Sequence, residues 1–596
     1  FCNSGTEAIE TALLTAKLFA GCDEVIALLL SFLPAFFSEP TIFSGRDQGS
    51  IAEAAWRLAE NGQLAFSTPA VKLFAEIYDS EAPVDIALNF PGFAYVGESV
   101  LVTAFPLGYT SWLAGFITLF GMHGYAVANG LLLFLSLITV YSVIRLFAHP
   151  FYALAGLILA GASFLPSWFA KLTLTENLAL FLFLFLAESL ILYLRSGRFA
   201  FYASALLAGG LFAFTRLEGF AFLGIALVIM LFSPHTRAIW KTYPLKSIIL
   251  PGLIFAIFLL RDFFLNLPYY RMAGKGLSKF AGSAEGGAII SGGTPLGPIL
   301  FTYGPLVLFI VGFFGILVFL KKRRYTLLLP ALIALPTFIY LFSPNITPDH
   351  PWMLRRYLFS IFPALLFSTV LGLALLFDKT GEDPIPAPRG KRLFFAGTIF
   401  ASLLILQLPA FLYALPYAEH RGLSGQIAAL SESFTDRDLV LVDRFTTGDN
   451  FAMLSGPTQF LHGKNTVYFF NPEDLDRRCA QRLAQRAPEG LGLGRMLQDQ
   501  RALQVVRAVQ AGREAEVPVE QRAQAREPIQ DVFRGHRRTP VCGVSAPGRA
   551  WAAPGADASR TARGCACTRR PSWFPARSRG SRPGTRPVPS SSCAAR

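Results

Sequence analysis

A few ionisable side chains interrupt a long apolar stretch of this chain, and they are the first places to look for chemistry. Residues 99–284 contain only four carboxylates, which are Glu176, Glu188, Glu218 and Asp262. A charged side chain at the centre of a membrane costs roughly 2.5–3.5 kcal/mol, so such groups usually serve a function. Each of the four is therefore a candidate, and Glu188, in the middle of an apolar run, has the least obvious structural explanation.

Asp47 is a further candidate, because it lies in a polar segment after an apolar run that ends near Phe37. The segment covers residues 44–64 (SGRDQGSIAEAAWRLAENGQL) and includes a short amphipathic helix predicted over Glu53–Glu60. A polar loop with an early carboxylate, ahead of an apolar body, is a favourable place for chemistry. The structural alternative is an aspartate that caps a loop.

The composition indicates what must position these side chains. The chain has 596 residues, is 53% hydrophobic and only 15% charged, and contains 56 Phe. Its mean hydropathy is +0.46. Repeated apolar runs of spanning length predict a polytopic membrane protein. The spans must be helical, because lipid cannot satisfy open backbone groups and the runs lack the alternation of a barrel.

The apolar runs predict about eleven transmembrane helices. Val25–Phe37 is shorter than the ~20 residues of a usual span and is interpreted as the remains of a first helix. The other predicted spans are 124–147, 150–168, 175–194, 199–214, 219–233, 247–264, 299–320, 325–342, 357–377 and 393–415. Leu107–Phe120 suits a helix lying at the membrane interface instead.

The basic residues between these runs set the predicted topology. With a cytoplasmic N-terminus, every cytoplasmic loop is short and carries Lys or Arg, as is usual for such loops. These basic residues are Arg145, Arg195, Arg198, Arg237, Lys241, Lys321, Lys322, Arg323, Arg324, Arg389, Lys391 and Arg392. The sequence thus predicts a multi-pass protein of the cell membrane, with Asp47 and the C-terminal segment on the outer face.

The predicted outer face gathers further charged residues near Glu176. Glu176 opens a predicted helix with Thr175 as its cap, and a carboxylate there is favoured by the helix dipole alone. Lys171 precedes this helix on the same side. Arg216 and Glu218 are two residues apart, so the simplest interpretation of Glu218 is a partner for Arg216.

A later outer loop is also rich in charge. Asp349, His350, Arg355 and Arg356 all fall within residues 343–356. The structural alternative for the arginine pair is that both side chains extend along apolar surface to keep their charges in water.

The first 21 residues differ from the rest of the chain. FCNSGTEAIETALLTAKLFAG has small residues at a helix start, which offer free N–H groups to an anion. This stretch resembles a fragment of the class III PLP-dependent aminotransferases. The remainder of such a cofactor site is missing, so this segment is predicted to be foreign and PLP is not expected.

The C-terminal part also changes character. Residues 477–596 hold 23 Arg, no Lys and 8 acidic residues, whereas the first 476 hold 30 basic and 31 acidic residues. The net charge of +14 is thus a property of the tail, and no nucleic-acid partner is predicted for the body. The tail is predicted to be disordered, or to be a frame-shifted reading. The alternative is a basic tail that binds anionic partners.

The fold class predicted is an all-α polytopic membrane protein with a small extracytoplasmic α/β segment and a disordered basic tail. Strands are expected at 438–443 and 466–470. The predicted domains are 1–21, the foreign fragment; 22–415, the transmembrane domain with an outer loop at 38–106; 416–476, the small outer segment; and 477–596, the tail.

Several short stretches occur in a recognisable order. They are Arg46–Gly49, Ala55 and Leu58–Gly62; Phe105–Tyr109 with Leu119–Gly121; Leu174–Glu176; Thr215–Gly219; and Arg356–Leu358 with Pro363. Over roughly residues 30–415 this order resembles the GT-C type membrane glycosyltransferases, especially the aminoarabinose-transferase and protein O-mannosyltransferase-like branch. Members often have two adjacent acids in the first loop, whereas here Gln48 follows Asp47.

The resemblance implies transfer of a sugar from a polyprenyl-phosphate-linked donor to a lipid, glycan or protein acceptor on the outer face. Asp47 would accept the proton of the acceptor hydroxyl, and Glu176 would position the donor or a catalytic cation. Cations would bind the donor phosphate and stabilise its developing charge, and the candidates are Arg356 first, then Arg216, Arg355 and Lys171. A single acid predicts no metal site, although a divalent cation stays open.

Two other functions compete with this one. A transporter or lipid flippase is also multi-span, but it predicts an internal repeat, which the sequence lacks. An O-antigen ligase or polymerase is expected to carry Arg and His in a late outer loop, and His350 with Arg355 and Arg356 keeps this alternative open.

Overall fold

The computed structural model describes most of the chain between residues 22 and 469. The described residues are 22–39, 47–68, 71, 89–96, 100–265, 267, 270, 296–342, 351–378, 383–436, 438–443 and 454–469. All of them belong to the first of two compact units, Phe1–Gln530, and the second unit is Asp531–Arg596. Residues 1–21, predicted to be a foreign fragment, residues 477–596, predicted to be a tail, and His350 lie outside the described residues.

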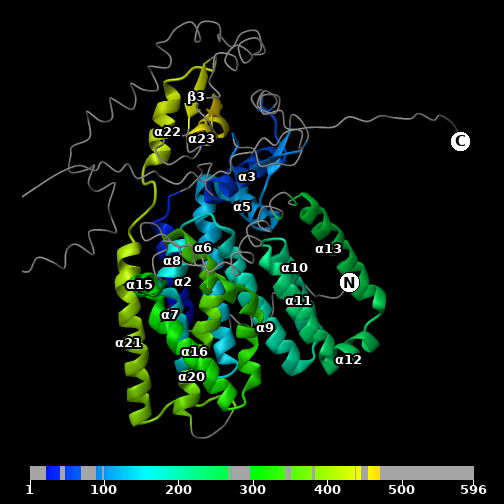
Figure 1. Ribbon diagram of the computed structural model, residues 1–596, viewed down its shortest axis with the longest axis vertical. Coiled ribbons are helices and arrows are strands. Elements are labelled where there is room, and N and C mark those ends of the chain that lie inside the picture. The colour runs from blue at the N-terminus through cyan, green and yellow to red at the C-terminus, as the bar shows by residue number, and fades with distance from the viewer. Residues whose placement is uncertain are drawn as a thin grey trace, which may run out of the picture. The chain divides into compact units, whose positions relative to one another are not determined.

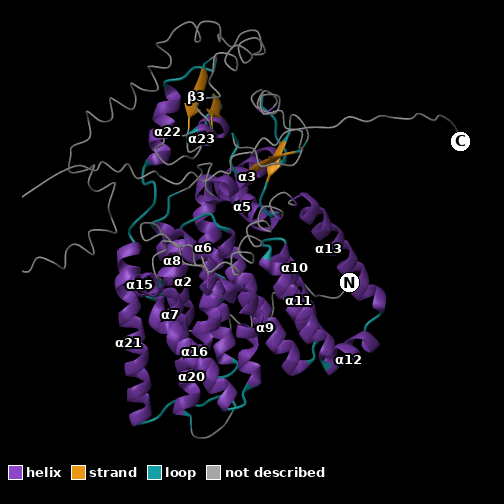
Figure 2. Cartoon of the chain, viewed as in Figure 1, coloured by secondary structure: helices purple, strands orange, loops and turns teal. Residues whose placement is uncertain are grey.

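The described part is mainly helical, as predicted, and its helices form a bundle (Figures 1 and 2). The helices up to residue 265 are α2 (Cys22–Phe36), α3 (Asp47–Asn61), α5 (Leu107–Phe120), α6 (Gly124–Arg145), α7 (Pro150–Gly161), α8 (Phe164–Phe169), α9 (Thr175–Ser196), α10 (Phe199–Ala213), α11 (Glu218–Phe232), α12 (Pro234–Thr242) and α13 (Leu245–Leu265).

The later helices complete the bundle and lead out of it. They are α15 (Leu296–Thr302), α16 (Pro305–Lys321), α17 (Leu329–Ala334), α18 (Ile339–Phe342), α19 (Arg355–Leu358), α20 (Ile361–Phe377), α21 (Lys391–Ala414), α22 (Leu423–Glu432) and α23 (Ser455–Phe460). Short 3-10 turns join some of them at Gly121–His123, Tyr325–Leu328, Leu335–Phe338 and Pro351–Leu354.

The core of the bundle is formed by helices that are apolar on every side. In α20 every residue from Ile361 to Leu375 is buried, as expected for a helix without a polar face. Helices α16 and α20 pack closely at two glycines, since a Cβ on Gly372 would lie 2.6 Å from the Cα of Gly315. Small residues at such contacts let helix backbones approach each other.

The expected count of eleven spans is not confirmed. Among the described residues, four helical stretches are long and apolar enough to cross a membrane: Leu107–Arg145, Thr175–Ser196, Tyr325–Phe342 and Lys391–Ala414. The number reaches seven if three bent pairs each count as one span: α11 with α12 (81°), α15 with α16 (110°), and Trp352–Leu358 with α20 (53°).

Individual predicted spans differ from the structure for local reasons. The run at 150–168 is divided into α7 and α8, which are separated near Ser163. The run at 325–342 is one helical stretch, as predicted, but it alternates between 3-10 and α-helical segments, and Pro330 and Pro336 each lie in the first turn of such a segment, where a missing N–H is tolerated. The helix predicted at the interface, Leu107–Phe120, is present and continues through a 3-10 turn into α6.

Two small sheets lie outside the bundle. The strands β1 (Phe93–Tyr95) and β2 (Leu101–Thr103) pair antiparallel within the region predicted as a long loop. The strands β3 (Leu439–Asp443) and β4 (Asn465–Phe469) pair parallel, each within one residue of its predicted position. The first pair escaped prediction because three residues are too few to display an alternating pattern.

Candidate functional site

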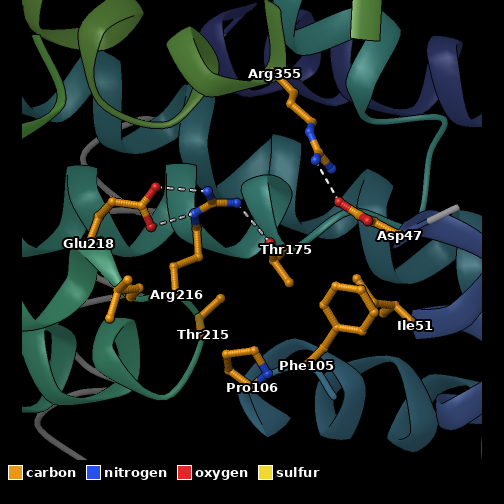
Figure 3. A pocket seen from close by; sticks show the side chains of 10 residues that line it. Asp47, Ile51, Phe105, Pro106, Thr175, Thr215, Arg216, Glu218 and Arg355 are labelled. Carbon is orange, nitrogen blue, oxygen red and sulfur yellow. Dashed lines mark hydrogen bonds and ion pairs between the residues drawn. The ribbon is translucent and has the colours of Figure 1, made fainter. Parts of the chain in front are cut away.

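One cavity among the described residues is lined by four of the candidate side chains, those of Asp47, Arg216, Glu218 and Arg355 (Figure 3). It has a volume of about 40 Å³ and lies where α3, α9, the start of α5, the turn before α11, and α19 meet. Its lining residues are Asp47, Ile51, Phe105, Pro106, Thr175, Thr215, Arg216, Leu217, Glu218 and Arg355.

Asp47 is the first residue of α3 and not part of a loop as predicted. A carboxylate in the first turn is favoured by the helix dipole. The helix is held in place from both sides, because Thr173 donates a hydrogen bond to the carbonyl of Gln48 (2.7 Å) and Tyr125 donates one to the carbonyl of Ala52 (2.8 Å). These contacts fix the position from which Asp47 enters the cavity.

Glu176 lies in the first turn of α9, as predicted, but Thr175 is not its cap. Leu174 occupies the N-cap position, and no side chain caps the helix there. The Thr175 hydroxyl instead accepts a hydrogen bond from Arg216 Nη1 (3.0 Å) and donates one to Glu176 Oε2 (3.2 Å). Glu176 itself is only 1% exposed, so its charge requires a cationic partner.

Arg216 is that partner, and it lies in the turn between α10 and α11. Its Nη1 is 2.8 Å from Glu176 Oε1, while Nε and Nη2 donate to the two oxygens of Glu218 at 3.2 and 2.9 Å. Burial alone would lower the pKa of this guanidinium, but the Glu176 and Glu218 carboxylates outweigh burial and raise the pKa well above its usual value. Arg216 therefore stays charged.

Arg355 joins Asp47 to this group. Its Nη2 lies 2.5 Å from Asp47 Oδ2, and its Nε lies 3.5 Å from Glu176 Oε1. The guanidinium also lies over the Trp352 ring, at 4.5 Å from the centroid. The structure thus forms an alternating chain of charges, Asp47–Arg355–Glu176–Arg216–Glu218, which we call the ion chain.

The ion chain has one exposed end. The Asp47 side chain is 40% exposed, whereas the other four members are exposed by 16% or less. At the other end, Tyr340 donates a hydrogen bond to Glu218 Oε1 (2.6 Å). No sequence signal distinguishes Tyr340, because it is one aromatic residue within an apolar run.

Two predicted phosphate-binding residues do not line the cavity. The Arg356 guanidinium lies over the Tyr340 ring, 5.4 Å from its centroid. Lys171 Nζ donates to three backbone carbonyls beyond and at the end of α21, those of Ala414 (2.7 Å), Leu415 (2.5 Å) and Tyr417 (2.8 Å).

Glu188 lies away from the cavity, and the described residues form no metal site. Glu188 accepts a hydrogen bond from Ser142 of α6 and does not line the cavity. Within the part of the chain that the structure describes, no group of three or more His, Cys, Asp or Glu side chains is arranged to hold a metal ion.

The geometry defines what the cavity can do. One exposed carboxylate can accept a proton, and two guanidinium groups can stabilise negative charge close to it. The apolar wall of Ile51, Phe105 and Pro106 faces these groups (Figure 3). At about 40 Å³ the cavity has room for water but not for a sugar, so a larger ligand must displace lining side chains.

Comparisons with known proteins return solved structures alone. No family model and no curated protein matches the chain. One similar structure is the archaeal oligosaccharyltransferase AglB from Archaeoglobus fulgidus in complex with an inhibitory peptide and a dolichol-phosphate. It shares 12% identity over 76% of this chain, with a TM-score of 0.45, and this chain spans 64% of its length.

Two further structures are of ArnT from Cupriavidus metallidurans. The apo form has 13% identity and a TM-score of 0.42, and the form bound to undecaprenyl phosphate has 14% identity and a TM-score of 0.40. Each alignment covers 80% of this chain and 89% of ArnT. AglB and ArnT are both GT-C glycosyltransferases, the type that the sequence motifs resemble. At these identities and TM-scores the likeness assigns no activity to this chain.

Proposed function

We propose that the protein is a membrane glycosyltransferase of the GT-C type. It moves a sugar from a polyprenyl-phosphate-linked donor to a lipid, glycan or protein acceptor at the extracytoplasmic face of the cell membrane. The observation that supports this most directly is the meeting of an exposed carboxylate, Asp47, with the buried cations Arg355 and Arg216 around one cavity.

Asp47 has the properties required of the group that activates the acceptor. The acceptor hydroxyl attacks the anomeric carbon of the sugar and must lose its proton to a nearby base. Asp47 is the most exposed member of the ion chain, so an acceptor can approach it without entering the buried part. Its Oδ2 accepts a hydrogen bond from Arg355, which holds the carboxylate at the edge of the cavity where the acceptor would lose its proton.

The arginines have the properties required of the groups that stabilise the leaving phosphate. The bond between the anomeric carbon and the phosphate oxygen breaks with its electron pair on the oxygen, so negative charge develops on the lipid phosphate. Arg355 and Arg216 line the cavity, and we assign them this role ahead of Arg356 and Lys171. Glu176 lies between the two arginines and orients both.

The apolar bundle suits the carrier. A polyprenyl chain needs only an apolar surface between helices, and helices such as α10, α11 and α13 expose many large apolar side chains.

The test is an assay in membranes that contain the protein. Polyprenyl-phosphate sugars are supplied, and release of polyprenyl phosphate is measured with and without an acceptor. Asp47→Asn is expected to reduce transfer by about 10²–10⁴-fold, the usual contribution of a general base. Asp436→Asn is the matched control, because Asp436 is 90% exposed and pairs with Lys464 away from the cavity.

Three results would contradict the proposal. If Asp47→Asn transfers sugar at the wild-type rate, Asp47 is not the group that accepts the proton of the acceptor hydroxyl. Movement of the intact lipid across the membrane without release of polyprenyl phosphate would favour a transporter or flippase. A product that lengthens by repeated glycan units would favour a polymerase.

A further inference from the structure

We infer that Tyr340 is a positioning residue for Arg216 and acts through Glu218; the inference rests on the proposed function. Tyr340 lies on α18, and the structure brings it to the Glu218 end of the ion chain. Its hydroxyl reaches a carboxylate that already holds an arginine of the cavity.

The hydrogen bonds to Glu218 leave its carboxylate one orientation. Oε1 accepts both the Tyr340 hydroxyl (2.6 Å) and Arg216 Nη2 (2.9 Å), while Oε2 accepts Arg216 Nε (3.2 Å). Glu218 and Arg216 are two residues apart, so their own backbone connection allows several mutual geometries. The Tyr340 hydroxyl selects one of them by holding Oε1 through a second hydrogen bond.

Tyr340 is itself held by the elements around it. The buried Tyr357 hydroxyl donates to the backbone carbonyl of Tyr340 (2.8 Å), and the Arg356 guanidinium lies over its ring. The motif around Arg356 and Tyr357 therefore contacts the ion chain through Tyr340, although only its neighbour Arg355 lines the cavity.

The consequence is a fixed plane for the Arg216 guanidinium. One edge faces Glu218, the other faces Glu176 and Thr175, and the Phe359 ring lies at 4.6 Å from the guanidinium carbon. Loss of the Tyr340 hydroxyl leaves the charge of Arg216 intact but frees the Glu218 carboxylate, which holds one edge of the guanidinium, to change its orientation. This change misplaces the cation relative to the phosphate oxygen on which charge develops.

The kinetic test compares Tyr340→Phe with the wild-type protein. We expect kcat to fall about tenfold while KM for the donor changes by less than about twofold, because positioning matters most in the transition state. The matched control is Tyr193→Phe, which removes another buried hydroxyl that bonds to Thr236 and does not line the cavity. Wild-type kcat in Tyr340→Phe would overturn the inference.

A labelling experiment tests the same contact without any transfer. An α-dicarbonyl reagent such as phenylglyoxal modifies accessible arginines, and mass spectrometry measures its rate at Arg216. Tyr340→Phe is expected to raise that rate several-fold, whereas Tyr193→Phe leaves it unchanged. In Glu218→Gln, the additional change Tyr340→Phe is expected to have a smaller effect than in the wild type, since both act at one contact.

The two experiments separate the failure of the inference from that of the function. A protein that consumes no polyprenyl donor contradicts the proposed function, and the labelling still decides whether Tyr340 holds Arg216. Equal labelling in the wild type and Tyr340→Phe, or strictly additive effects with Glu218→Gln, would overturn the inference.

Discussion

The cavity and the end of α21 both hold buried cations, and the difference between their partners is instructive. Arg216 and Arg355 bind carboxylate side chains, one of which is exposed. Lys171 binds three backbone carbonyls instead. A carboxylate partner can move aside when an anion arrives, whereas carbonyls at a helix end need a permanent donor. All three residues are basic side chains in the sequence, but only the two arginines have partners that a negatively charged substrate can displace.

Among the variants of the cations, Arg216→Met is expected to have the largest effect, because Arg216 joins Glu176 to Glu218 in the ion chain. Glu176 would remain buried without its closest cation, and breaking such a buried pair lowers the free energy of unfolding by about 3–5 kcal/mol. Transfer is expected to fall by about 10²–10³-fold, as for other lost charge-stabilising groups. Thermal unfolding and donor turnover measure the two effects.

The control for this change is Arg198→Met, since Arg198 is exposed at the start of α10 and does not line the cavity. It should leave both quantities near their wild-type values. If Arg216→Met still transfers sugar within a few-fold of the wild type, the cavity is not where charge develops.

A pair of adjacent substitutions sharpens the comparison further. We expect Arg355→Gln to reduce kcat/KM for the donor by about 100-fold, and Arg356→Gln by less than about tenfold. The reason is that Arg355 pairs with Asp47 in the cavity, whereas Arg356 lies over Tyr340. The same donor assay on both variants measures these losses. A larger loss of kcat/KM in Arg356→Gln than in Arg355→Gln would show that Arg356 binds the donor phosphate.

The two arginines also show how far sequence reasoning reaches. The motif indicates that an arginine at this position is functional, and the apolar surroundings single out Glu176 and Glu218. However, consecutive residues of a helix point about 100° apart, so spacing alone cannot tell whether Arg355 or Arg356 faces the cavity. The direction of α19 decides it, and that depends on packing.

The fold shows the same limit. Apolar runs predict helices well, since burial of a whole face or a whole helix leaves a long pattern. Bends such as that of 81° between α11 and α12, and strands as short as β1 and β2, depend on contacts distant in sequence and leave little local trace. Lys171 is another case, because its acceptors lie more than 240 residues later in the chain.

Lys171→Met is the prediction with the smallest effect on transfer, and it separates the two kinds of cation most directly. Lys171 is 6% exposed, and its ammonium donates to the carbonyls of Ala414, Leu415 and Tyr417; the Tyr417 ring also stacks on that of Trp168. Removing it leaves three carbonyls without a charged donor, which should lower the free energy of unfolding by about 2 kcal/mol. Because Lys171 does not line the cavity, KM for the donor should change by less than about threefold.

Thermal unfolding in detergent and donor kinetics are measured on the same preparation. A tenfold rise in KM with unchanged unfolding would show instead that Lys171 leaves its carbonyls to bind the donor phosphate, and the distinction between the two kinds of cation would no longer hold.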